Sequence, residues 1–155
     1  CLEAQRATAD EFSLATLRHF RAADVVVRAH VDLRHAAARY AGIVARYQGP
    51  ADKNMLLALV AQADSGFHAQ MWQQRGAVWS CLKTAKLSRG HGQLELQAIG
   101  SEAIISFEDQ PLIRCHIPGS IEAGGVGLRA AGATIRVFTA RDSSAAGDFR
   151  TRRCG

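Results

Sequence analysis

The chain has 155 residues, 48% hydrophobic and 21% charged, so it fits one domain with one core and its composition excludes intrinsic disorder. Its net charge of +5 is spread along the chain, except for a basic cluster at residues 150–153, and this spread does not suggest a nucleic-acid partner. The most apolar run, residues 55–61, is far shorter than the ~18 residues of a membrane span. We interpret residues 141–155 as a solvated basic C-terminal tail.

The first 23 residues show no clear hydrophobic period. Leu14, Leu17 and Phe20 have helical spacing, but the same residues suit a short edge strand. We interpret residues 1–23 as an N-terminal extension or edge segment that is mostly irregular, with one short strand. A brief helical turn is expected at residues 33–41, within a loop that joins two strands.

From residue 24 onward, hydrophobic and polar residues alternate, as in half-buried strands. Residues 54–61 are apolar on both faces and predict a central strand. Further strands are expected at residues 24–33, 42–47, 66–74, 77–82, 92–100, 103–108, 111–117, 125–130 and 133–140. Closely spaced strands separated by turn residues indicate an antiparallel sandwich or barrel rather than βαβ units.

Two glycine- and turn-rich stretches are interpreted as sheet geometry. Glu108 to Gln110 predict a hairpin, with Pro111 at the entrance of the return strand, where its missing N–H matters least. The glycines at 124, 125 and 127 precede a strand instead of a helix, so they predict a tight entry and close sheet packing rather than a phosphate cradle.

The four cysteines, Cys1, Cys81, Cys115 and Cys154, lack the spacing of a zinc or redox motif. A chain that starts at Cys1 is either trimmed or begins at a mature processed end, and a mature lipoprotein would carry its lipid anchor on Cys1. In an exported protein, one or two disulfides are expected. Cys1 would pair with Cys154 if Cys1 carries no lipid, whereas a lipid on Cys1 leaves at most one pair among Cys81, Cys115 and Cys154. The alternative is a cytosolic protein with four reduced cysteines.

From Asp24 to Thr139 the order of features resembles the concanavalin A-like lectin/glucanase superfamily, particularly bacterial laminin-G-like and 3-keto-disaccharide-hydrolase-like domains. The stretches that support the resemblance are "ADVVVRAHVDL", "AGIVARYQGPADKNMLLALV", "GQLELQAIGSEAIISFEDQPLI" and "GGVGLRAAGATIRVFTAR". The resemblance implies an all-β fold: an antiparallel jelly-roll β-sandwich of two sheets with little helix, formed by residues 24–140. Cys1 to Ala23 lack the tryptophan-containing first strand of such domains, so a shortened or rearranged first edge is expected.

In lectin-like members of this superfamily, a concave sheet face or its rim binds sugars, because aromatic rings stack on sugar C–H faces while polar groups bond the hydroxyls. Trp79 is a weaker candidate for such a site, and Trp72 has the alternative role of packing beneath a loop or against a partner protein. The candidate ligand-binding residues are Trp72, Gln70, His68, Arg46 and Arg28.

No pair of carboxylates with the spacing of a retaining glucanase is found, so we expect a protein that is not an enzyme. No metal motif is found either, so calcium is not indicated and no cofactor is expected. The main hypothesis is an exported, periplasmic or cell-surface accessory subunit that docks on other subunits of an envelope or membrane-bound complex, with membrane attachment only through a lipid on Cys1. The alternative is a carbohydrate-binding module, and a glycoside-active enzyme is a third.

Overall fold

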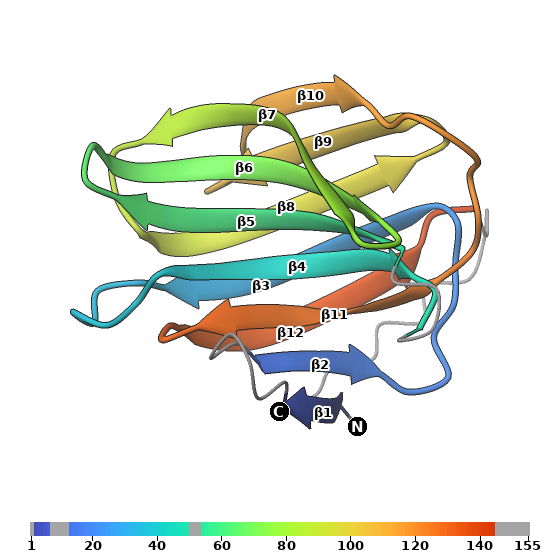
Figure 1. Ribbon diagram of the computed structural model, residues 1–155, viewed down its shortest axis with the longest axis horizontal. Coiled ribbons are helices and arrows are strands. Elements are labelled where there is room, and N and C mark those ends of the chain that lie inside the picture. The colour runs from blue at the N-terminus through green and yellow to red at the C-terminus, as the bar shows by residue number, and fades with distance from the viewer. Residues whose placement is uncertain (1, 7–12, 50–53, 145–155) are drawn as a thin grey trace.

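The computed structural model describes residues 2–6, 13–49 and 54–144, and it describes the side chains of all of these except residues 2–6. All regular elements in these ranges are strands, arranged in two antiparallel sheets that face each other (Figure 1). The all-β sandwich predicted from the alternating pattern is therefore confirmed. Among the described residues there is no helix of the length and hydrophobicity needed to cross a membrane.

The first sheet has seven strands. In spatial order these are β1 (Leu2–Arg6), β2 (Ser13–Leu17), β11 (Gly125–Ala131), β4 (Tyr40–Tyr47), β5 (Met55–Ala63), β6 (Gly66–Arg75) and β7 (Val78–Leu87). The N-terminal residues thus supply two strands at one edge of this sheet. In Figure 1 the seven-stranded sheet lies in front of the other one, so its outer face is turned toward the viewer.

The second sheet has five strands. Their spatial order is β10 (Gln110–His116), β9 (Glu102–Phe107), β8 (His91–Ile99), β3 (Val25–Asp32) and β12 (Thr134–Asp142). The hairpin expected at Glu108 is present, because Glu108 and Asp109 both have positive φ and join β9 to β10. Pro111 lies on the edge strand β10, as expected of a residue that has no N–H to donate.

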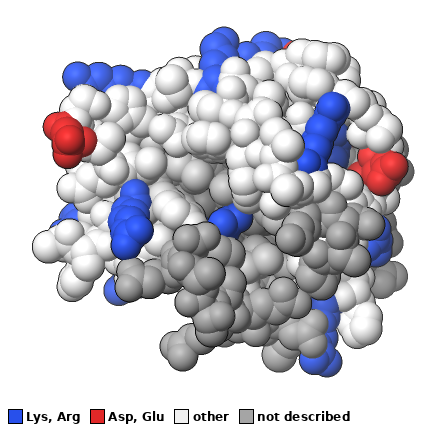
Figure 2. Space-filling model, in the orientation of Figure 1, with Lys and Arg blue, Asp and Glu red and all other residues white. Residues whose placement is uncertain are grey.

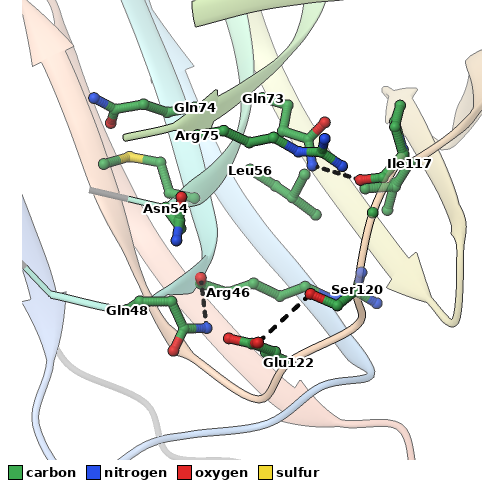
Figure 3. A pocket seen from close by; sticks show the side chains of 13 residues that line it. Arg46, Gln48, Asn54, Leu56, Gln73, Gln74, Arg75, Ile117, Ser120 and Glu122 are labelled. Carbon is green, nitrogen blue, oxygen red and sulfur yellow. Dashed lines mark hydrogen bonds between the residues drawn. The ribbon is translucent and has the colours of Figure 1, made fainter. Parts of the chain in front are cut away.

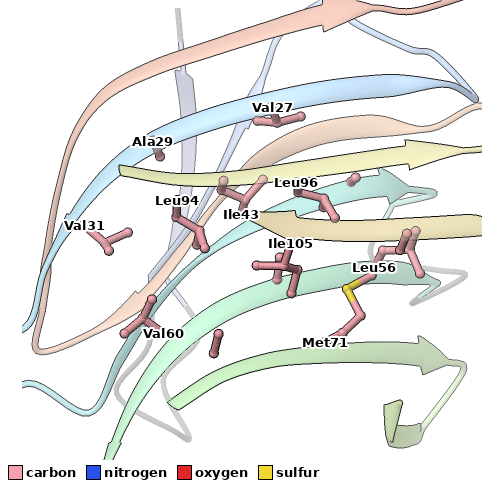
Figure 4. Close-up of a cluster of buried hydrophobic side chains, with 14 of the residues drawn as sticks. Val27, Ala29, Val31, Ile43, Leu56, Val60, Met71, Leu94, Leu96 and Ile105 are labelled. Carbon is pink, nitrogen blue, oxygen red and sulfur yellow. The ribbon is translucent and has the colours of Figure 1, made fainter. Parts of the chain in front are cut away.

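The core fills the space between the two sheets with the apolar residues of the alternating pattern (Figure 4). Val27 and Val31 of β3, Ile43 of β4 and Met71 of β6 all belong to this core, and all four side chains are fully buried. This burial accounts for the alternation along β3 and β8, although Val26 and Glu95 on the outer face of the same sheet are also buried. No helix covers a sheet in the described ranges, since each sheet buries its inner face against the other.

Gly124, just before β11, and Gly127, within it, allow a close approach of neighbouring backbones, as the sequence predicts. A Cβ at Gly124 would lie 2.3 Å from the carbonyl carbon of Arg46, and one at Gly127 would lie 2.2 Å from the carbonyl oxygen of Ala15. Gly124 also exchanges two backbone hydrogen bonds with Ala22. The helical turn expected before β4 is not present; residues 33–39 form a loop with a turn closed by the Ala38 N–H on the His35 carbonyl.

Candidate functional site

The seven-stranded sheet has a second apolar layer on its outer face, away from the core between the sheets. Residues of β5 alternate between the two layers: Leu56, Ala58 and Val60 enter the core, whereas Leu57 and Leu59 lie on the outer face. Both outer leucines are nevertheless buried, because large side chains from neighbouring strands lie against them. This arrangement confirms the prediction of a central strand and shows that its outer side is also covered.

Aromatic side chains meet above this layer in a hollow of about 240 Å³, which we call the aromatic hollow. Both tryptophans of the chain line it, although they lie on different strands. The residues that line it are Tyr40, Leu57, Leu59, Ala61, Gln70, Trp72, Trp79 and Arg129. The hollow thus combines three aromatic rings with an amide and a guanidinium on a floor of aliphatic side chains.

Gln70 and Trp72 share the outer face of β6, two positions apart. The indole N–H of Trp72 donates to Oε1 of Gln70 at 2.9 Å, which holds the indole and leaves the amide nitrogen of Gln70 free to donate elsewhere. Leu57 pairs with Trp72 on the neighbouring strand, so the ring has a buried leucine beside it. The ring of Trp72 is therefore positioned by the fold before any ligand binds.

Tyr40 of β4 and Trp79 of the edge strand β7 lie on the same face of the sheet, and both contact Arg129 of β11. The Arg129 guanidinium lies 4.9 Å from the centre of the Trp79 ring, a cation–π distance, and its Nε donates to the Tyr40 hydroxyl at 3.2 Å. These contacts bring side chains from β4, β7 and β11 into one hollow.

Gly42 of β4 allows β4 to pack closely against β5 beneath the aromatic hollow. It lies beside Leu59 on β5, and a Cβ at this position would be 2.6 Å from the Ala58 carbonyl oxygen and 2.8 Å from the Leu59 Cβ. Any larger residue would push β5 away from β4. The glycine therefore permits close strand packing beneath the aromatic rings.

A second hollow, of about 330 Å³, lies at one end of the sandwich, where the loop before β11 passes the ends of β4, β5 and β6 (Figure 3). Polar contacts fix its wall: Gln73 Nε2 donates to the Pro118 carbonyl at 2.9 Å, and Gln48 Nε2 donates to the Arg46 carbonyl at 3.2 Å. Glu122 is the single carboxylate among the described residues that line it. We call it the end hollow.

Arg46, a predicted ligand residue, lies in the wall of the end hollow with its guanidinium bound to backbone. Its φ of 53° breaks the alternation of β4, and its side chain is 6% exposed. Nε donates to the Ala23 carbonyl and an Nη to the Gly100 carbonyl, both at 2.7 Å, and Asp24 lies 3.8 Å away. Burial lowers the pKa of Arg46, which the Asp24 carboxylate partly offsets. These contacts are those of a side chain that holds loops together.

The remaining predicted ligand residues divide between two faces. Trp72, Gln70 and His68 lie in sequence along the outer face of β6. Arg28 lies on the outer face of the five-stranded sheet, where it forms an ion pair with Glu95. One site therefore contains Trp72 and Gln70 with His68 beside it, whereas Arg28 and Arg46 lie elsewhere.

Cys81 and Cys115 are both free thiols, Cys81 exposed and Cys115 partly buried. Burial raises the pKa of the Cys115 thiol. The other two candidates, Cys1 and Cys154, lie outside the described residues, so the predictions of a lipid anchor and of a disulfide to Cys154 stay predictions. Within the described ranges, no group of three or more potential metal ligands is clustered.

Sequence reasoning missed Tyr40, Leu57, Leu59 and Arg129, and it ranked Trp79 below Trp72. One signal for Trp79 was present: a two-residue turn at Gly76 pairs Gln74 with Trp79, which places Trp79 on the face of Trp72. No comparable signal identified Arg129. Its strand, β11, is far from β4 in the sequence, and only the fold places the two strands side by side.

No family model and no curated protein sequence matches the chain. Several solved structures, however, share its fold. The carbohydrate-binding module CBM66 from Bacillus subtilis superposes with a TM-score of 0.68 at 16% identity, covering 87% of each chain. A toad ovary galectin solved with thio-digalactose gives 0.59 at 10% identity, covering 86% of this chain and all of the galectin. The chain has the galectin-like, concanavalin A-like lectin fold.

This lectin fold also forms part of larger proteins. A variant of the GH43 protein BlXynB from Bacillus licheniformis matches with a TM-score of 0.60 at 15% identity, but this chain spans only 30% of that protein. The matches to CBM66 and the galectin, by contrast, cover most or all of those chains. At these identities the likeness concerns the fold alone, and the superfamily resemblance predicted from the sequence is confirmed at that level.

Proposed function

We propose that the chain is a carbohydrate-binding module and that its aromatic hollow is the sugar site. The observation behind this proposal is that Trp72, Trp79 and Tyr40 meet in one hollow together with Gln70 and Arg129. Aromatic faces pack against the C–H faces of sugar rings, while amide and guanidinium groups bond hydroxyls. The floor of buried leucines keeps the rings in place and so lowers the conformational cost of binding.

The fold comparisons support the proposal, since the matched CBM66 is named as a carbohydrate-binding module and the matched galectin was solved with thio-digalactose. In this chain, sugar binding would involve only noncovalent contacts. No carboxylate occurs among the described residues that line the aromatic hollow. We retain the prediction that the chain is not an enzyme.

The test is binding to a glycan array, followed by titration of each bound glycan while tryptophan fluorescence is recorded. Because both tryptophans of the chain line the hollow, the emission reports on this site alone. We expect Trp72→Ala to weaken binding by about tenfold or more, since truncating a central aromatic anchor costs about 1.4 kcal/mol or more. Trp72→Phe should retain part of the affinity because it keeps a ring.

Ile99→Ala is the matched control, since Ile99 is an exposed hydrophobic residue on β8 of the other sheet. It should bind the same glycans as the unmodified chain. Circular dichroism of each variant shows whether the sandwich is retained. Glycan binding that persists unchanged in folded Trp72→Ala and Trp79→Ala would place the site elsewhere and contradict the proposal.

The second candidate is the accessory subunit expected from the sequence. The apolar floor of the aromatic hollow supports it, because leucines flanked by aromatic rings also suit a protruding apolar side chain of a partner subunit. Co-purification from the native source distinguishes the two. A partner that is lost with Trp72→Ala, together with no glycan on the array, would favour docking.

A further inference from the structure

Charged residues are divided unequally between the two sheets. The six strands of the seven-stranded sheet with described side chains contain no Asp or Glu. Their basic residues, His apart, are Arg46, Arg75, Lys83, Lys86 and Arg129. The five-stranded sheet contains both acidic and basic residues, which form the ion pairs of Arg28 with Glu95 and of Arg114 with Glu102.

The outer face of the seven-stranded sheet shows the same imbalance (Figure 2). In this view basic side chains are spread over the described surface, while acidic ones appear only near its margins. Arg129 places one positive charge within the aromatic hollow, where Tyr40 and Trp79 hold its guanidinium. The described residues that line the hollow therefore include one positively charged side chain and no negatively charged one.

Lys86 extends this positive charge beyond the hollow, and His68 lies beside it. The strand register places Tyr40, Ala61, His68 and Lys86 opposite one another across β4, β5, β6 and β7. The alternation puts all four on the outer face, because their neighbours Phe67, Ala69, Ala85 and Leu87 pack against the core. Tyr40 and Ala61 line the hollow, and neighbouring strands are about 4.8 Å apart, so Lys86 lies about 10 Å from Ala61.

Lys86 is available to a ligand. Its side chain is exposed, and none of the ion pairs between described residues involves it. His68 beside it contacts the Ser65 hydroxyl at 3.5 Å and otherwise faces solvent with Lys86. A cation with no acidic neighbour on its strand binds an external anion without first breaking an internal pair.

We infer that the glycan bound at the aromatic hollow is an anionic oligosaccharide, one whose sugar rings carry carboxylate or sulfate groups. This inference rests on the function proposed above. One ring of the glycan stacks in the hollow on Trp72, and an anionic group on another ring of the same oligosaccharide reaches Lys86 and His68. A single acidic monosaccharide is too short to make both contacts, since Trp72 and His68 are four residues apart on β6, about 13 Å.

The test compares polygalacturonate with its fully methyl-esterified form, which removes the charge and leaves the sugar rings unchanged. Titrations at low ionic strength, followed by tryptophan fluorescence, should show at least tenfold tighter binding of the charged polymer. Lys86→Gln should weaken that binding by roughly fivefold, the effect of one exposed charge contact. Dextran sulfate measured against dextran tests sulfate in place of carboxylate, and tighter binding of either charged polymer supports the inference.

Lys83→Gln is the matched control, because it removes the same charge from the same strand while its Nζ is bound to the Arg114 carbonyl at 3.1 Å. It should leave the affinity for polygalacturonate nearly unchanged. Two results would indicate a general attraction to polyanions and overturn the inference. One is an equal loss of affinity for polygalacturonate in the two variants. The other is binding of polyglutamate or of an oligonucleotide as tight as that of the acidic glycan. Trp72-dependent binding of neutral glycans with no effect of charge would overturn it while leaving the proposed function intact. If no glycan binds at all, the proposed function itself fails.

Discussion

Arg46 shows how one residue leaves a regular pattern for a structural reason. A positive φ is unfavourable for a residue with a Cβ, and here it turns the guanidinium toward the end of the sandwich. There the side chain donates to the carbonyls of Ala23 and Gly100, which belong to two different connections. Alternation placed Arg46 on the outer face because a sequence pattern does not reveal such a reversal.

We expect Arg46→Gln to lower the free energy of unfolding by about 2 to 4 kcal/mol, because two carbonyls lose charge-assisted hydrogen bonds in a buried place. Arg46→Lys should recover less than half of this loss, since an ammonium cannot reproduce the fork of the guanidinium. Urea denaturation provides the measurement. Arg136→Gln on the exposed side of β12 is the control, and equal unfolding midpoints for the two Gln variants would refute this role.

Strand β5 has two buried faces for two different reasons. Leu56 belongs to the core between the sheets, whereas Leu57 lies under the aromatic rings. An apolar run on both faces predicts a central strand, and this prediction is confirmed. The pattern does not say whether the second face is covered by another layer of structure or only by side chains of the same sheet.

These two leucines offer a test at the level of the strand. Leu56→Ala and Leu57→Ala should each reduce stability, by about 2 to 5 kcal/mol for the core residue. Only Leu57→Ala should also weaken glycan binding, because it removes support from Trp72. Stability is measured by urea denaturation and glycan affinity by fluorescence titration of the same samples. An equal effect of the two substitutions on binding would show that the floor of the hollow does not position the rings.

Local patterns predicted the strands and the β9–β10 hairpin, because alternation and turn residues act within a few positions. The aromatic hollow was only partly predictable. Trp72 and Gln70 are two positions apart on one strand, so the period alone places them together. Arg129 and Trp79 are fifty positions apart and lie on strands that are not neighbours in the sheet. Their contact depends on the strand order, which the sequence pattern does not reveal.

At the scale of the whole molecule, the two sheets differ in chemistry. The five-stranded sheet carries paired charges on its outer face, whereas the seven-stranded sheet carries aromatic and basic side chains on its own. The sandwich is stabilised mainly by the buried inner faces of its two sheets, so the side chains on the two outer faces can differ. We therefore propose that the outer face of the seven-stranded sheet is the one that binds a ligand.

The most direct test of that proposal is an NMR titration of the tryptophan indole N–H signals with a glycan selected on the array. The chain gives two such signals, one from Trp72 and one from Trp79, and replacing each tryptophan with phenylalanine assigns them. We predict that both signals shift in proportion to bound glycan, while backbone amides of the five-stranded sheet stay in place. Shifts confined to that sheet or to the end hollow, with both indole signals unmoved, would contradict the account.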